Sequence, residues 1–114
     1  MKYHPFNLRR RIAAHRYRKK EFSAVVQKTE AFLAKDPNDI FMLELRARAF
    51  TSLREWEKGL NCYKKVFDID PNYQDCSFQL ARCAVYTKNW KILDSAIPSI
   101  VDPRKIEEIQ NAFV

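Results

Sequence analysis

Apolar residues recur at every third or fourth position along most of this chain, which is the spacing of an amphipathic α-helix. The stretch from Val25 to Leu33 shows the i, i+3, i+4, i+7 pattern most clearly. Alternating runs of Val, Ile and Thr, which would indicate strands, are absent, and good helix formers dominate. The pattern therefore predicts an all-α protein.

The same pattern divides the chain into seven expected helices joined by short turns. Their approximate ranges are 7–20, 22–35, 39–53, 56–69, 74–87, 90–101 and 103–113. Phe22 is expected at the first turn, and Asp36-Pro37 ends the second helix, because proline disfavours a helical residue before it and lacks the N–H that continues the ladder. Asn38 or Asp39 can cap the third helix.

Two further prolines shape the C-terminal part. Pro98 falls inside the sixth expected helix, so we expect that helix to be kinked or short. Asp102-Pro103 opens the last helix, with aspartate as N-cap and proline in the first turn, where its missing N–H is harmless. That helix can cap the end of the fold.

Several markers return after 34 residues. Pro37 and Pro71 share this spacing. So do two series of three, one aromatic and one of alanines: Phe22, Trp56 and Trp90, and Ala13, Ala47 and Ala81. Markers of different kinds in one register indicate an array of structural repeats.

With 114 residues and 13.6 kDa, the chain is predicted to form a single domain over residues 1–114. Its single glycine, Gly59, lies inside an expected helix, where glycine costs about 1 kcal/mol against alanine. We expect a close helix crossing there to compensate.

The best-defined repeat, residues 40–73, resembles the tetratricopeptide repeat family. The residues that carry this resemblance are Leu43, Ala47, Phe50, Trp56, Gly59, Tyr63, Val66 and Pro71. Residues 6–39 and 74–103 match less completely, and the latter departs at Pro98. The resemblance implies three helix–turn–helix repeats and a C-terminal capping helix (about 103–113), wound into a short right-handed superhelix with a concave groove.

Carried over to this chain, the resemblance implies which side chains line the groove. They are Arg10, Tyr17, Arg18, Phe41, Arg48, Phe78, Arg82 and Tyr86. Arg48 and Arg82 are one repeat apart. Because arginine binds carboxylates through two parallel hydrogen bonds and aromatics supply apolar anchors, we expect a partner peptide or protein with interleaved acidic and apolar residues.

The positive charge is concentrated at the N-terminus. The net charge is +7, and residues 1–35 contribute ten Lys or Arg against Glu21 and Glu30. A basic surface is expected from Arg9, Arg11, Arg16, Lys19 and Lys20. It suits an acidic protein, a nucleic acid or an anionic membrane, because clustered cations release counterions from phosphates.

Other chemistry finds little support in the sequence. Cys62, Cys76 and Cys83 form no CxxC pair and are expected to be reduced, buried residues rather than metal ligands. The serines have no His/Asp partners in register, so we expect no catalysis and no cofactor. No signal-peptide h-region or membrane-length apolar run is present, which predicts a soluble, cytoplasmic protein.

Taken together, the patterns predict a non-catalytic scaffold or adaptor for protein–protein interaction, similar to a co-chaperone. The alternative is an N-terminal targeting or regulatory module of a larger protein, in which the basic first repeat meets an anionic surface.

Overall fold

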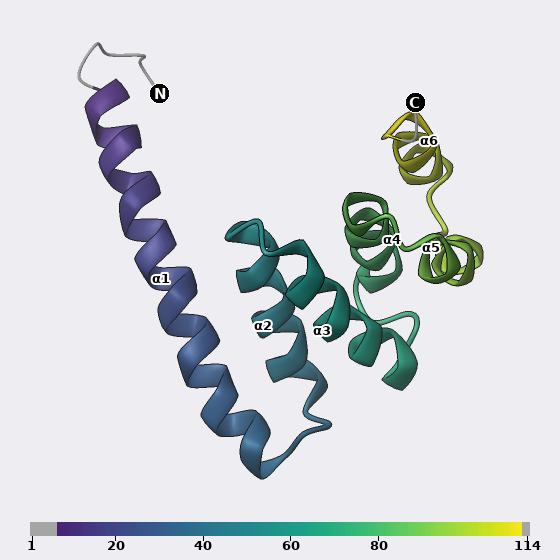
Figure 1. The fold of residues 1–114 in the computed structure, drawn as a ribbon, viewed down its shortest axis with the longest axis horizontal. Coiled ribbons are helices and arrows are strands. Elements are labelled where there is room, and N and C mark those ends of the chain that lie inside the picture. The colour runs from purple at the N-terminus through teal and green to yellow at the C-terminus, as the bar shows by residue number, and fades with distance from the viewer. Residues whose placement is uncertain (1–6, 113–114) are drawn as a thin grey trace.

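A computed structural model describes the backbone of residues 7–112 and the side chains of residues 19–112. The described chain is compact and built from helices, with no strand in that part (Figure 1). The elements are α1 (Asn7–Lys35), α2 (Ile40–Ser52), α3 (Trp56–Ile69), α4 (Cys76–Thr87), α5 (Trp90–Ala96), the 3-10 helix η1 (Ile97–Ser99) and α6 (Pro103–Ala112). The prediction of an all-α protein is confirmed.

The expected turn at Phe22 is wrong, because α1 continues without interruption from Asn7 to Lys35. Residues 19–24, Lys-Lys-Glu-Phe-Ser-Ala, contain neither glycine nor proline, and each of them is compatible with a helix interior. Local helix preference therefore prevails over the 34-residue register. The predicted unit 6–39 is one long helix and the turn after it, rather than a helix–turn–helix.

Each helix packs mainly on the next one along the chain, and α6 packs back on α4 (Figure 1). With 29 residues, α1 is about 43 Å long, whereas the 13 residues of α2 span only about 20 Å. The contact between them uses the C-terminal half of α1, where Val26 and Leu33 pack against the core.

The turns that follow α2 and α4 have the same hydrogen-bond pattern. After α2, Glu55 N–H donates to the Phe50 carbonyl at 2.9 Å, and Arg54 N–H donates to the Thr51 carbonyl at 3.0 Å. After α4, Asn89 donates to Ala84 at 2.8 Å and Lys88 to Val85 at 3.2 Å. This is the Schellman arrangement, with Arg54 at φ 60° and Lys88 at φ 58°. Both left-handed residues occupy the same place, 34 residues apart.

The Asp-Pro segments also share one local structure. Asp36 and Asp70 each accept a hydrogen bond on Oδ1 from the backbone N–H two residues later, at 3.2 and 3.0 Å. Asp102 does the same toward Arg104 at 2.9 Å. The predicted cap at Asp39 is confirmed, because its carboxylate accepts the Met42 N–H at 3.2 Å.

The core confirms the close crossing predicted at Gly59. A Cβ added there would lie 2.8 Å from Thr51 Cγ2 on α2 and 3.6 Å from Cys83 Sγ on α4. Ala47 and Ala81, one period apart, are both fully buried. Small residues thus let α2, α3 and α4 approach one another closely.

At the C-terminal end, Pro98 shortens the sixth helix as predicted. The expected helix 90–101 is replaced by α5, which ends at Ala96, and by a single 3-10 turn. Pro103 then begins α6, which buries Ile109 and half-buries Ile106 against the core.

Candidate functional site

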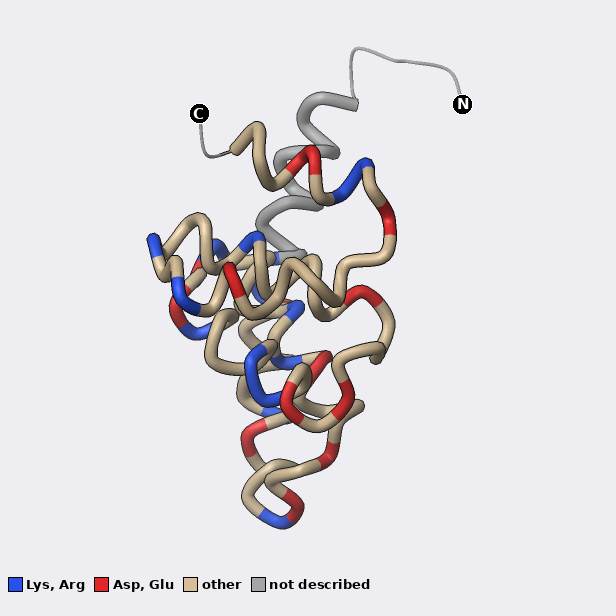
Figure 2. The backbone as a smooth tube through the Cα atoms, turned by 90° about the vertical axis from the view of Figure 1, so that its right-hand side faces the viewer, with Lys and Arg blue, Asp and Glu red and all other residues tan. Residues whose placement is uncertain are grey.

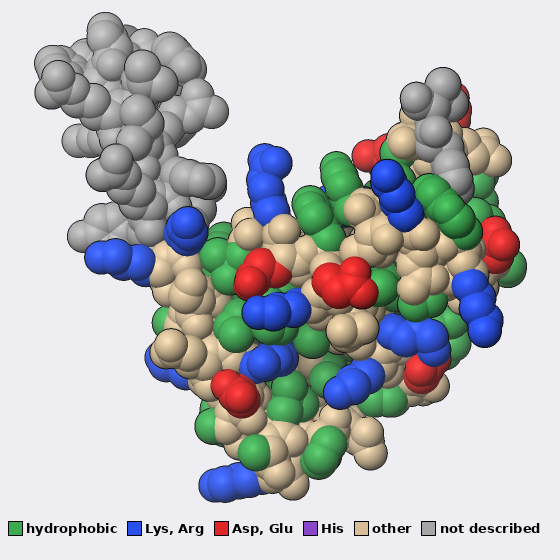
Figure 3. All heavy atoms as spheres, viewed as in Figure 1, with side chains coloured by type: hydrophobic (Ala, Val, Ile, Leu, Met, Phe, Trp, Pro, Cys, Tyr) green, Lys and Arg blue, Asp and Glu red, His purple; other side chains and the backbone are tan. Residues whose placement is uncertain are grey.

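Exposed large side chains on α2 and α4 make up the candidate site. Phe41 on α2 and Tyr86 on α4 are 56% and 59% exposed, which is unusual for residues of this size. Apolar side chains lie exposed among basic ones on the face shown in Figure 3. Figure 2 shows acidic and basic residues interspersed along the described helices.

Arg48 on α2 already has a partner within the chain. Its Nε donates to Glu44 Oε2 at 3.0 Å, and its Nη2 donates to the other carboxylate oxygen, so the pair is bidentate. The Glu44 side chain is only 9% exposed, whereas Arg48 is 55% exposed. The hydrogen bond from Glu44 raises the pKa of Arg48 above its ordinary value. The charge of this predicted groove arginine is therefore largely neutralised in place.

Arg82 on α4 is one period away and differs in this respect. Its Cζ lies 5.4 Å from the centroid of the Trp56 ring, a cation–π contact. No acidic side chain among residues 19–112 pairs with it, and its buried Nε has no hydrogen-bond partner there. Tyr86, one turn further along α4, stacks on the same Trp56 ring at 4.1 Å between centroids and 8° between planes. We call Trp56, Arg82 and Tyr86 the aromatic–arginine cluster.

Phe78 does not serve as the exposed anchor that the sequence suggested. It is 8% exposed, and the Lys105 ammonium of α6 lies 4.9 Å from its ring centroid. Lys105 also contacts Asp75 at 3.3 Å. Because α6 packs back on α4, Phe78 lies in a cleft of about 280 Å³ formed by the 71–75 turn, α4, the 99–102 segment and α6.

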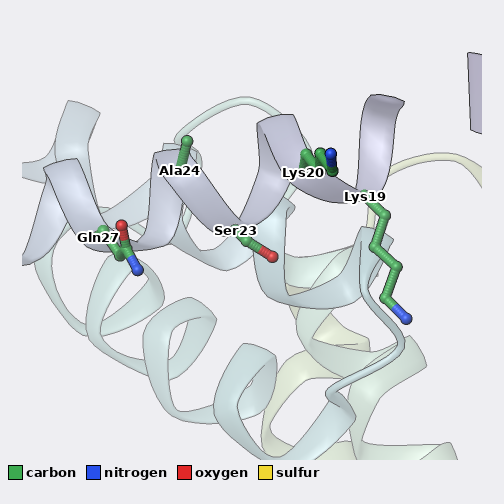
Figure 4. A pocket seen from close by; sticks show the side chains of 5 residues that line it. All are labelled: Lys19, Lys20, Ser23, Ala24 and Gln27. Atoms are coloured by element: carbon green, nitrogen blue, oxygen red, sulfur yellow. The ribbon is translucent and has the colours of Figure 1, made fainter. Parts of the chain in front are cut away.

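Most of the predicted basic surface falls outside the described side chains. Those residues are Arg9, Arg10, Arg11, Arg16, Tyr17 and Arg18. Lys19 and Lys20 are described and exposed. Together with Ser23, Ala24 and Gln27 they line an open hollow along one side of α1 (Figure 4).

Arg46 is an important contact that the sequence analysis did not assign. Its Nη1 donates to the Val26 carbonyl at 2.6 Å and reaches Thr29 Oγ1 at 3.4 Å, and its Cζ lies 5.0 Å from the Phe50 ring centroid. It thereby fastens α1 to α2. The signal was present, because Arg46 occupies the i+3 place of the apolar stripe that begins at Leu43.

The three cysteines are buried and unpaired. Burial raises the pKa of Cys83 to about 12 and that of Cys76 to about 11, and it also raises the pKa of Cys62. Thiols of this kind stay protonated near neutral pH and make poor nucleophiles. Within residues that the structure describes, no group of three or more His, Cys, Asp or Glu side chains is arranged to hold a metal ion.

No protein-family model, curated protein or solved structure matches this chain. Among the described helices, none combines the length and the apolar character needed to cross a bilayer.

Proposed function

We propose that this protein is a non-catalytic scaffold of the tetratricopeptide type, which binds a partner peptide or protein through exposed side chains of α2 and α4. In this proposal, α2–α3 and α4–α5 are two helix–turn–helix repeats, α1 is an elongated first helix, and α6 covers the C-terminal end.

The repeat arrangement is supported by the turns. Left-handed residues at Arg54 and Lys88 lie 34 residues apart and close the same two hydrogen bonds. The aspartates at 36 and 70, at the same period, cap the same backbone position. Identical local structures at one spacing are the property expected of stacked repeats.

The observation that carries the binding function is the exposure of large side chains on the alternating helices. Phe41 and Tyr86 exceed half exposure although the core of the array is closed without them. Aromatic residues are enriched at the energetic centres of protein interfaces, because one side chain covers a large area at little entropic cost.

The test is capture of partners from a nuclease-treated lysate, with the wild-type chain, Phe41→Ala/Tyr86→Ala and Lys64→Ala/Lys65→Ala as baits. The control pair lies on α3. The proposal expects specific proteins that the control retains and the aromatic variant loses, followed by direct binding of the purified partner. Identical capture by all three baits, with unchanged circular dichroism, would refute it.

A second candidate is a targeting or regulatory module of a larger protein that meets an anionic surface. Lys19 and Lys20 favour it, because both are exposed and neither pairs with a described acidic side chain. Binding to single-stranded nucleic acid or to phosphatidylserine vesicles should then fall steeply with salt and be reduced by Lys19→Glu/Lys20→Glu. Unchanged binding by that variant would exclude these two lysines from the contact.

A further inference from the structure

Arg48 and Arg82 occupy equivalent places one period apart, yet the structure gives them different surroundings. Arg48 is held by a buried carboxylate of its own helix. Arg82 rests against the Trp56 ring and has no acidic partner among the described side chains. Of the two arginines, Arg82 is the one whose charge is available to a ligand.

We propose that the aromatic–arginine cluster binds a single carboxylate and an adjacent apolar side chain of a partner peptide. The assignment rests on the proposed scaffold function and specifies the chemistry of its ligand. The terminal nitrogens of Arg82 hold the carboxylate, and the free face of Tyr86 accepts the apolar side chain.

The geometry suits this ligand in two ways. The contact with Trp56 partly removes the Arg82 guanidinium from water and limits its rotation, so less is lost when it forms charge-assisted hydrogen bonds. One face of Tyr86 is stacked on Trp56 while the side chain remains 59% exposed, which leaves the opposite face for an apolar group.

The surrounding charges favour one carboxylate over a polyanion. Trp56 is flanked in sequence by Glu55, which pairs with Lys58 at 3.3 Å, and by the exposed Glu57. A nucleic acid would bring several phosphates toward these carboxylates, and like charges at short range repel. A peptide with an isolated glutamate avoids this repulsion.

The experiment uses labelled nine-residue peptides with a central Glu-Phe in a Ser/Ala background, and fluorescence anisotropy with the full chain. Matched peptides carry Gln-Phe or Glu-Ala, and a labelled decathymidylate represents the polyanion. The variants are Arg82→Gln and Tyr86→Ala. Arg104→Gln is the control, because it removes the same charge from a side chain that is 90% exposed on α6.

We expect Gln-Phe to bind the wild type about tenfold more weakly than Glu-Phe does, as for loss of a charged hydrogen bond. Arg82→Gln should lose a similar factor for Glu-Phe and almost nothing for Gln-Phe, because the two changes remove the same interaction. Tyr86→Ala should weaken Glu-Phe more than Glu-Ala, and Arg104→Gln should bind as the wild type does.

Three results would overturn the assignment: no saturable binding of Glu-Phe, equal loss of both peptides in Arg82→Gln, or tighter binding of decathymidylate than of Glu-Phe. The scaffold function is judged separately. A lysate partner that is lost with Phe41→Ala/Tyr86→Ala but retained with Arg82→Gln keeps the scaffold and removes this site. A partner retained by both variants removes both proposals.

Discussion

Replacing Gly59 with alanine tests the close packing of α2, α3 and α4. In an open helix this change stabilises the protein by about 1 kcal/mol, because alanine loses less backbone entropy than glycine. Here the added Cβ would lie 2.8 Å from Thr51 Cγ2, closer than non-bonded carbon atoms approach. The neighbouring side chain must therefore move.

Thr51 cannot move without cost. It is 7% exposed, and its hydroxyl donates to the Arg48 carbonyl at 3.0 Å, so a rotation that removes the methyl group breaks this bond. Overpacking of this kind costs about 1–3 kcal/mol. After subtracting the helix-propensity gain, we expect Gly59→Ala to lower the free energy of unfolding by about 0–2 kcal/mol.

Thr51→Ser removes the methyl group that clashes and keeps the hydroxyl. Alone it should cost about 1 kcal/mol for the lost buried methyl. In that background Gly59→Ala should become stabilising by up to about 1 kcal/mol, so the two changes couple by about 1–3 kcal/mol. Urea unfolding followed by circular dichroism at 222 nm gives all four values, with the m value as a check. If Gly59→Ala stabilises the wild type by the full helix-propensity gain, the crossing is not close and the reasoning fails.

Three further predictions concern individual contacts. Arg46→Met keeps the apolar stem but loses the hydrogen bond to the Val26 carbonyl, so amides of residues 22–35 should exchange about two- to tenfold faster, as measured by mass spectrometry. Arg48→Gln leaves the buried Glu44 carboxylate without its partner and should cost about 1–2 kcal/mol in urea unfolding, most of which Glu44→Gln/Arg48→Gln recovers. Burial raises the pKa of Cys83 from 9.0 to about 12, so on raising the pH the unfolded state loses this proton first. The resulting stability is complete below about pH 9 and is lost up to about pH 12, and Cys83→Ala should flatten this fall by up to about 1.4 kcal/mol per pH unit.

Each of these predictions has a result that contradicts it. Exchange in α1 that is unchanged by Arg46→Met would show that other contacts hold α1 to α2. A double variant no more stable than Arg48→Gln would show that the unpaired carboxylate is not the source of the loss. Equal pH slopes for wild type and Cys83→Ala between pH 9 and 10.5 would mean that this thiol reaches solvent in the folded state.

Features governed by local chemistry were predictable from the sequence. Asp36-Pro37 ends α1 at Lys35, Asp39 caps α2, and Pro98 reduces the sixth helix, because each effect depends only on a residue and its near neighbours. The turn at Phe22 was inferred from the period alone. Without a helix-breaking residue nearby, that inference had no local cause behind it.

The chemistry of the candidate site was less predictable, because it depends on contacts between helices. Spacing placed Arg48 and Arg82 in equivalent positions, but it could not show that Glu44 neutralises the first while Trp56 supports the second. Likewise, the stack of Trp56 on Tyr86 joins residues 30 positions apart through the antiparallel packing of α3 and α4. Phe78 became buried because α6 folds back over α4, a contact that the repeat pattern does not encode.

The packing of each helix on its sequence neighbour has a consequence for how this protein folds. Chains whose contacts join residues close in sequence have low contact order and fold rapidly, because little loop entropy is lost before the contacts form. In such a chain the central pair α3 and α4, supported on both sides, should form the nucleus, and the terminal helices should add to it in sequence. Kinetic phases slower than milliseconds are then expected only from isomerisation of its X-Pro bonds, Asp70-Pro71 among them.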